Sequence, residues 1–274
     1  MIAPEPRDLL DLAVTVAREA GALVATRRPP GAGEPGIAVL STKTSPTDVV
    51  TAMDHASEAL IRSRLLAKRP DDGFLGEEST GFAGASGVQW VVDPIDGTVN
   101  YLYGIPAYAV SIAARWRGEV VAGAVHNPVS GETWTASLGG GARLDGEPIR
   151  VNDRAELRSA LVATGFGYDA GDRAVQGALA GRLAPRVRDL RRIGAATLDL
   201  CAVATGRVDA YYEQGLQPWD LAAAGLVATE AGARVEGAWG APADETLVIA
   251  APPLLFGLLH DEVAELAGGL PTRS

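Results

Sequence analysis

The segment from Val91 to Thr98 contains two carboxylates, Asp93 and Asp96, three positions apart and directly after an apolar run. We expect a buried strand to end at Asp93, and a tight turn to bring both carboxylates to one side. The backbone N–H groups of Gly97 and Thr98 then lie at the start of a helix. Because carboxylates bind hard cations and helix-start amides bind anions, the segment predicts a divalent metal and a phosphate together.

Further oxygen ligands for such a cation can be found on both sides of this segment. The Ile95 carbonyl lies inside the same turn. Glu77 follows a short strand at 73–76 and lies beside Asp93 if the two strands are neighbours, although a solvated pair of loop acids is the alternative. Asp220 stands at a helix start, where it is either a capping acid or a ligand that also aims one oxygen into a cleft.

Four other positions have residues that could act in the site, but their sequence patterns are less specific. Asp54 lies in the first turn of a helix, where an exposed acid is the alternative, and Lys43 lies in a polar loop where it is either solvated or meets a phosphate. Glu213 ends a strand, and its carboxylate can accept hydrogen bonds from a polyol hydroxyl. A helix begins after Ile193, and its first amides either contact a ligand or simply pack; these residues are Gly194, Ala195 and Ala196.

Hydrophobic periodicity predicts the elements that hold these residues. Helices are expected at 6–27, 51–68, 171–184, 195–205, 218–231 and 253–267. Strands are expected at 73–76, 88–93, 107–116, 119–127, 131–137, 159–164, 187–190, 208–213, 233–236 and 245–250. The first half is an antiparallel meander, whereas the second half alternates strands and helices. We therefore expect an α+β lobe at 1–150 with the metal and phosphate site, and an α/β lobe at 151–274 that supplies Asp220. The resemblance described below adds a substrate wall to the second lobe.

The composition narrows the class of protein. The chain has 274 residues and a formal net charge of -10, which disfavours general binding to nucleic acid or to an anionic membrane. A single cysteine, Cys201, forms no internal disulfide and fits a reducing compartment. The sequence shows neither a signal peptide nor an apolar run long enough to span a bilayer, so we expect a cytoplasmic protein.

Taken in order, these motifs resemble the inositol monophosphatase family over roughly residues 5 to 265. The matching pieces are 43–54, 76–79, 90–98, 191–213 and Trp219-Asp220 with its Ala-rich helix. The resemblance implies a layered α-β-α-β-α sandwich of the inositol monophosphatase and fructose-1,6-bisphosphatase type, usually a homodimer. It also implies hydrolysis of a phosphate monoester with two or three Mg²⁺ ions per active site, and inhibition by lithium.

The resemblance assigns roles position by position. Residues that resemble the metal ligands are Glu77, Asp93, Ile95 through its carbonyl, Asp96 and Asp220. Glu77 and Thr98 resemble the pair that orients the attacking water, and Asp54 resembles the acid behind that threonine. Amides of Gly97 and Thr98 resemble the phosphate cradle, and Lys43 resembles the lysine of a mobile loop. Residues that resemble the sugar-contacting wall are Gly194, Ala195, Ala196, Glu213 and Asp220.

Substrate identity is less sharply indicated. The run Tyr211-Tyr212-Glu213 and the pair Trp219-Asp220 favour a phosphatase of inositol monophosphate or a similar small polyol phosphate. Residues 164–168 and 214–218 lie where the family varies, so histidinol phosphate, fructose 1,6-bisphosphate and 3′-phosphoadenosine 5′-phosphate stay open as substrates. A non-catalytic regulatory or binding dimer is the alternative from another class. It predicts the loss of at least one metal acid, yet all four are present.

Overall fold

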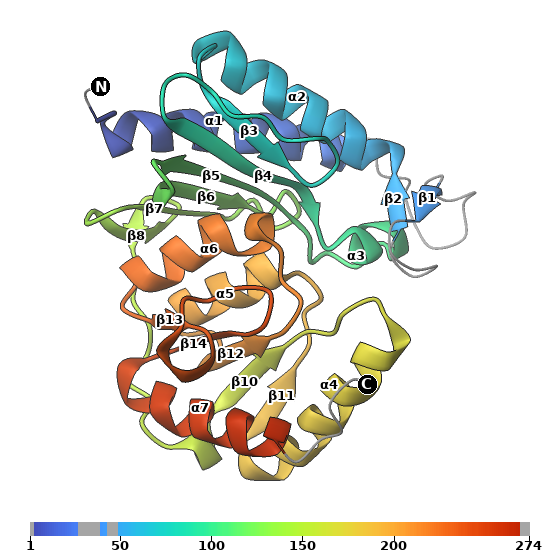
Figure 1. The fold of residues 1–274 in the computed structure, drawn as a ribbon, viewed down its shortest axis with the longest axis vertical. Coiled ribbons are helices and arrows are strands. Elements are labelled where there is room, and N and C mark those ends of the chain that lie inside the picture. Colours follow the sequence, from blue (N-terminus) through green and yellow to red (C-terminus); the bar gives the residue numbers. More distant parts are fainter. Residues whose placement is uncertain (1–2, 27–38, 43–48, 269–274) are drawn as a thin grey trace.

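The computed structural model describes residues 3–26, 39–42 and 49–268 (Figure 1). The helices are α1 (Pro6–Thr26), α2 (Ala52–Lys68), α3 (Thr98–Tyr103), α4 (Ala170–Leu183), α5 (Ala196–Ala204), α6 (Pro218–Glu230) and α7 (Pro253–Gly268). Short 3-10 turns are η1 (Leu157–Ser159), η2 (Ala184–Arg186) and η3 (Ala238–Gly240). Lys43, the predicted loop lysine, lies outside the described residues.

The strands form two large sheets and one hairpin. The seven-stranded sheet runs in the order β3 (Gly73–Gly76), β4 (Val88–Asp96), β5 (Ala109–Trp116), β6 (Glu119–His126), β7 (Thr133–Ser137), β8 (Gly141–Leu144) and β9 (Glu147–Pro148). The five-stranded sheet runs in the order β11 (Asp189–Arg191), β10 (Leu161–Thr164), β12 (Ala210–Glu213), β14 (Val248–Ala251) and β13 (Arg234–Glu236). The hairpin pairs β1 (Val39–Thr42) with β2 (Val49–Thr51).

Strand direction differs between the two sheets. In the larger sheet only β3 and β4 are parallel, and every later pair is antiparallel, as the predicted meander requires. In the smaller sheet β10 is parallel to both of its neighbours, whereas β14 pairs antiparallel with β12 and β13. The alternating second half of the sequence therefore folds as a mixed sheet.

The two sheets and the helices stack in five layers (Figure 1). Alternate side chains of β4 point to opposite faces: Trp90 and Val92 pack in a core with α1 and α2, whereas Val91 packs in the core of α5 and α6. On the far side of the smaller sheet, α4 and α7 cover a third core. The predicted α-β-α-β-α sandwich is confirmed.

Helices α5 and α6 occupy the middle layer, and their composition follows from that position. A helix between two sheets is buried on both sides, so it is apolar around most of its circumference. Small side chains allow close approach to the larger sheet: a Cβ added to Gly123 of β6 lies only 2.8 Å from the Ala223 Cα of α6. The Ala-rich sequence after Asp220 thus presses the start of α6 onto the sheet that carries the other acids.

The structure differs from the sequence predictions at three places. Strand β4 does not end at Asp93 but continues to Asp96, with a break in its register against β5 between these two residues. Pro94 lies in this break, where its missing N–H costs no ladder hydrogen bond. The sequence also gave no expectation of the β1–β2 hairpin or of β8 and β9. The division into lobes near residue 150 stays a prediction.

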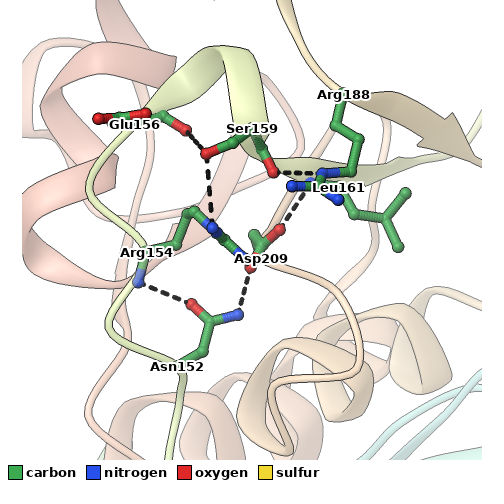
Figure 2. Close-up of polar contacts among 7 residues, drawn as sticks. All are labelled: Asn152, Arg154, Glu156, Ser159, Leu161, Arg188 and Asp209. Carbon is green, nitrogen blue, oxygen red and sulfur yellow. Dashed lines mark hydrogen bonds and ion pairs between the residues drawn. The ribbon is translucent and has the colours of Figure 1, made fainter.

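A polar cluster anchors the connection between the two sheets (Figure 2). Asp209, which is 5% exposed and lies just before β12, accepts a hydrogen bond of 2.6 Å from the Leu161 amide. Arg154 Nε donates to the same carboxylate at 3.3 Å, and Asn152 donates through its side-chain amide. Because a buried carboxylate needs such partners, this cluster fixes the start of β10 beside β12.

Candidate metal and phosphate site

Three carboxylates from distant parts of the chain converge at one point. Asp93, Asp96 and Asp220 each offer an oxygen, and these oxygens all lie within 4.8 Å of one another. Two of the acids flank the register break of β4, and the third lies in the first turn of α6. The predicted convergence of Asp220 on the Asp93 turn is thus present in the fold.

Glu77 joins this group through the pairing of β3 with β4. The strands are parallel with Gly76 opposite Val92, and the Glu77 amide donates to the Val92 carbonyl at 3.2 Å. Burial, followed by repulsion from Glu77, raises the pKa of Asp93 well above its usual range. The pKa of Asp220 is raised by burial and then by the charges of Asp96 and Glu77. The cluster is therefore a strong centre of negative potential that a cation would neutralise.

Asp96 is held by the start of α5. Its Oδ2 accepts the Thr197 amide at 2.7 Å and also the Thr197 hydroxyl. Burial raises the pKa of Asp96, and the hydrogen bonds from Thr197 and from the Ala196 amide oppose that rise. We expected the first amides of this helix to contact a ligand or to pack. In the fold, the amides of Ala196 and Thr197 bond to Asp96, a predicted metal ligand, and sequence spacing gave no sign that Thr197 is its partner. Contact of the 194–196 amides with a ligand stays a prediction.

Thr98 forms a buried pair with Asp54 at the side of the acidic cluster. The Thr98 hydroxyl lies 3.1 Å from Asp54 Oδ1 and 3.0 Å from the Ile95 carbonyl oxygen. Asp54 is fully buried and also caps α2 by accepting the Thr51 amide at 2.8 Å. The alternative of an exposed helical acid is therefore wrong. The Thr98 hydroxyl therefore contacts Asp54, the acid that the family resemblance places behind it.

Gly97 makes the turn from β4 into α3 and needs to be glycine. Its φ is +88°, a left-handed conformation that other residues rarely adopt. A Cβ at this position lies 3.0 Å from the Ala107 carbonyl oxygen and 3.1 Å from the Ala195 side chain. The predicted phosphate cradle thus packs directly against the 194–196 turn of the predicted substrate wall.

Glu213 ends β12, near enough to Asp96 and Arg192 for their charges to affect its pKa. It accepts a hydrogen bond of 2.6 Å from the Tyr211 hydroxyl. Burial raises the pKa of Glu213 to about 7, and the Tyr211 hydrogen bond opposes the rise. A Cβ on Gly165 lies only 1.9 Å from the Glu213 carboxylate. The absence of a side chain at Gly165 therefore leaves the space that this carboxylate occupies.

Asp199, in the first turn of α5, is a buried acid that we did not predict. Only 1% of the residue is exposed, and its Oδ1 has no hydrogen-bond partner within the described part of the chain. Burial, with repulsion from Glu213 and Asp96, raises the pKa of Asp199 to about 9. It therefore remains protonated at neutral pH, near Glu213 and Asp96.

Replacing Asp199 with asparagine is expected to stabilise the protein in a pH-dependent way. The folded pKa of about 9 exceeds the unfolded value of 3.8, so the stability that this proton contributes is lost as pH rises between them. Asparagine removes that loss, and we expect the melting temperature at pH 8 to rise by about 5 °C or more. At pH 4 the two proteins should melt together. An equal difference at both pH values contradicts the assignment.

The fold and this site together define a layered α+β protein with a cluster of carboxylates that could hold a metal ion, beside a threonine–aspartate pair. The family model described as the inositol monophosphatase family matches residues 5–267. An inositol-1-monophosphatase of Mycobacterium bovis is 49% identical over 245 residues, covering 84% of each chain. The Nus factor SuhB of Escherichia coli is 39% identical over 82% of this chain and 83% of that protein. This chain belongs to the inositol monophosphatase family.

A solved structure agrees with this assignment. The extragenic suppressor protein suhB from Bartonella henselae superposes with a TM-score of 0.88 at 34% identity, covering 96% of this chain and all of that one. Among the described residues, no helix combines the length and apolarity needed to cross a membrane.

Proposed function

We propose that this protein is a Mg²⁺-dependent phosphatase that releases phosphate from inositol monophosphate or a similar small polyol phosphate. The observation that carries the proposal is the convergence of Asp93, Asp96 and Asp220, joined by Glu77, beside the Thr98–Asp54 pair. Family membership supports phosphatase chemistry, and the M. bovis relative supports the substrate class.

The donor set fits Mg²⁺. This ion prefers carboxylate and carbonyl oxygens, and the cluster offers four carboxylates with the Ile95 carbonyl nearby. The pKa of Asp93 is raised by burial and by its acidic neighbours, so a bound cation would relieve the repulsion within the cluster. We propose that Glu77, Asp93, Ile95, Asp96 and Asp220 hold two or three Mg²⁺ ions. When bound, Mg²⁺ would lower the pKa of water and neutralise charge on the phosphate and the leaving oxygen.

The Thr98–Asp54 pair provides a route for a proton. The Thr98 hydroxyl can donate to Asp54 Oδ1 and accept a hydrogen bond from the attacking water at the same time. Burial raises the pKa of Asp54, which favours its acceptance of a proton. Because the Thr98 amide begins α3, it has no acceptor within the helix and can point at a phosphate oxygen. Hydrolysis in this arrangement needs no covalent intermediate.

Substrate hydroxyls would meet the wall formed by Glu213 and the 194–196 turn. Once ionised, the Glu213 carboxylate accepts hydrogen bonds from a polyol while Tyr211 holds its other side. Its pKa of about 7 places this change of charge within the neutral range. We therefore propose that binding of the polyol strengthens as pH rises through 7.

The proposal extends to assembly and regulation. By family resemblance, we propose that the protein is a cytoplasmic homodimer, that lithium inhibits it, and that Lys43 meets the phosphate or its water. The name Nus factor borne by relatives such as the E. coli protein favours a second candidate, a regulatory binding role. The complete set of acids favours the enzyme, and the net charge of -10 argues against general nucleic-acid binding.

A panel of phosphate esters with Mg²⁺ tests the proposed function. We expect kcat/KM for inositol 1-phosphate to exceed that for histidinol phosphate, fructose 1,6-bisphosphate and 3′-phosphoadenosine 5′-phosphate by about tenfold or more, because the Glu213 carboxylate would accept hydrogen bonds from polyol hydroxyls. Phosphate release is measured for each at equal Mg²⁺, with Asp93→Asn as the blank. If another ester is hydrolysed fastest, that ester replaces inositol 1-phosphate as the proposed substrate. If no ester releases phosphate, the regulatory binding role is favoured.

A further inference from the structure

Helix α2 presents a polar face to the site, although α2 supplies none of the clustered carboxylates. Asp54, Ser57 and Glu58 are spaced i, i+3 and i+4, so they share one face. All three are buried, with Ser57 at 0% and Glu58 at 4% exposure. Besides the bond from Thr98 to Asp54, the Ser57 hydroxyl donates to the Pro94 carbonyl at 3.1 Å. This face therefore contacts two parts of the Asp93 turn.

Glu58 extends the same face to the turn that carries Glu77. Its Oε2 accepts the backbone amide of Glu78 at 2.8 Å. On the other side of Glu77, a Cβ added to Gly76 lies 2.2 Å from the same oxygen. The Glu58 carboxylate thus fills the space left by the missing side chain of Gly76 and contacts both neighbours of Glu77.

These contacts fix the backbone on both sides of Glu77. The peptide before it is held by the bond from the Glu77 amide to the Val92 carbonyl, at 3.2 Å. The peptide after it is held by the charge-assisted bond from the Glu78 amide to Glu58. With both peptide planes fixed, the Cα–Cβ direction of Glu77 is fixed as well. The Glu77 carboxylate lies near enough to Asp93 to raise its pKa.

We infer that Glu58 is a positioning residue of the metal site, acting through the Glu78 amide to orient the Glu77 carboxylate. The inference rests on the proposed Mg²⁺ site. Glu58 itself stays engaged with the backbone and does not contact the cation. Its loss leaves a part-buried amide without its acceptor and frees the Glu77 turn, so metal binding weakens while the remaining ligands stay in place.

Calorimetric titration of Mg²⁺ into the metal-free protein tests this inference. We expect Glu58→Ala to raise the Kd for Mg²⁺ by about 10-fold to 100-fold, the range found when partners of metal ligands are removed. Glu58→Gln retains an oxygen acceptor of the same shape and should stay within about threefold of the wild type. If Glu58→Ala fails to fold, Gly76→Ala provides a second variant, since its methyl group displaces the Glu58 carboxylate. A rise in Kd is expected there too.

Asp209→Ala is the matched control for a general loss of stability. Asp209 is also a buried carboxylate that accepts a backbone amide, from Leu161 at 2.6 Å, but it lies in the polar cluster that holds the start of β10 beside β12 (Figure 2). We expect this variant to have a lower melting temperature and an unchanged Kd for Mg²⁺. An unchanged Kd in folded Glu58→Ala, or an equal rise in Asp209→Ala, overturns the inference. If the wild type binds Mg²⁺ but releases no phosphate, the proposed function is contradicted. The comparison of Kd values between the variants remains valid in that case.

Discussion

Replacing Asp93 with asparagine is expected to lower kcat/KM for phosphate release by about 10³-fold or more. Asp93 lies at the centre of the acidic cluster, where Glu77, Asp96 and Asp220 all raise its pKa in addition to burial. A metal ion supplies several kcal/mol of charge stabilisation in such reactions, and each ~1.4 kcal/mol corresponds to a tenfold rate change. Asp93→Asn removes the carboxylate charge at the centre of the cluster, so we expect the variant to lose most of the catalytic rate. Steady-state phosphate release at saturating Mg²⁺ provides the measurement.

The same variant should remain folded, which separates chemistry from stability. Asparagine relieves the repulsion that the metal-free cluster imposes on Asp93, so the melting temperature without metal should equal or exceed that of the wild type. Mg²⁺ should stabilise the wild type by mass action and have much less effect on the variant. An active Asp93→Asn protein, or one that Mg²⁺ stabilises as strongly as the wild type, contradicts the metal assignment.

Removing the hydroxyl of Thr98 is the second change with a large expected effect. Thr98→Ala should lower kcat by about 10²-fold to 10⁴-fold, the usual contribution of positioned proton transfer. The hydroxyl lies 3.1 Å from Asp54 and is the group that can pass the proton of water to that acid. Because the metal acids are untouched, the Kd for Mg²⁺ should change little. Presteady-state and steady-state release at saturating Mg²⁺ give kcat for comparison.

Thr98→Ser is the matched control, because serine keeps the hydroxyl and loses only a methyl group. We expect it to retain most of the activity. Asp54→Asn should reproduce the loss seen in Thr98→Ala, and the double variant should lose little more, since both residues act as one unit. A Thr98→Ala protein within a fewfold of wild-type kcat removes the proposed proton route.

Most of the fold could be predicted from the sequence because most helices and strands have a local pattern of apolar residues. Apolar periodicity placed the outer helices, and α6 was marked by the Ala-rich run after Asp220. The ending of β4 was misplaced for a tertiary reason. Pro94 predicts that a ladder stops, but the register break against β5 lets the strand resume and reach Asp96. The β1–β2 hairpin has too few residues for a period to be visible.

Residue type and spacing marked the site most clearly where its chemistry lies in one segment, whereas the roles expected of Glu77, Asp54 and Asp220 came from the family resemblance. Asp93, Asp96 and Gly97 are neighbours in sequence, so their roles follow from residue type and turn geometry. Partners chosen by the packing of distant elements left no local signal. Thr197 contacts Asp96 across 101 positions, and Glu58 contacts the Glu78 amide across 20. The helical spacing of Asp54 and Glu58 is the one pattern that could have indicated a shared polar face on α2.

The burial of an acidic residue is another property that the sequence alone does not reveal. The sequence presents Asp199 as an ordinary acid in a helix, whereas its 1% exposure arises only when the layers assemble around α5. Only the assembled middle layer brings it near Glu213 and Asp96 and raises its pKa to about 9. Tertiary structure therefore keeps Asp199 neutral at pH 7, whereas residue type alone predicts an ionised carboxylate.

The central claim is that the acidic cluster makes this chain a Mg²⁺-dependent phosphatase. Its most direct test is to strip the protein with a chelator, add Mg²⁺ in steps, and follow phosphate release from inositol 1-phosphate. We predict no release before Mg²⁺ is added, a saturable rise as it is restored, and no rise in Asp93→Asn. Release that is independent of divalent cations, or no release at any Mg²⁺ concentration, contradicts the claim.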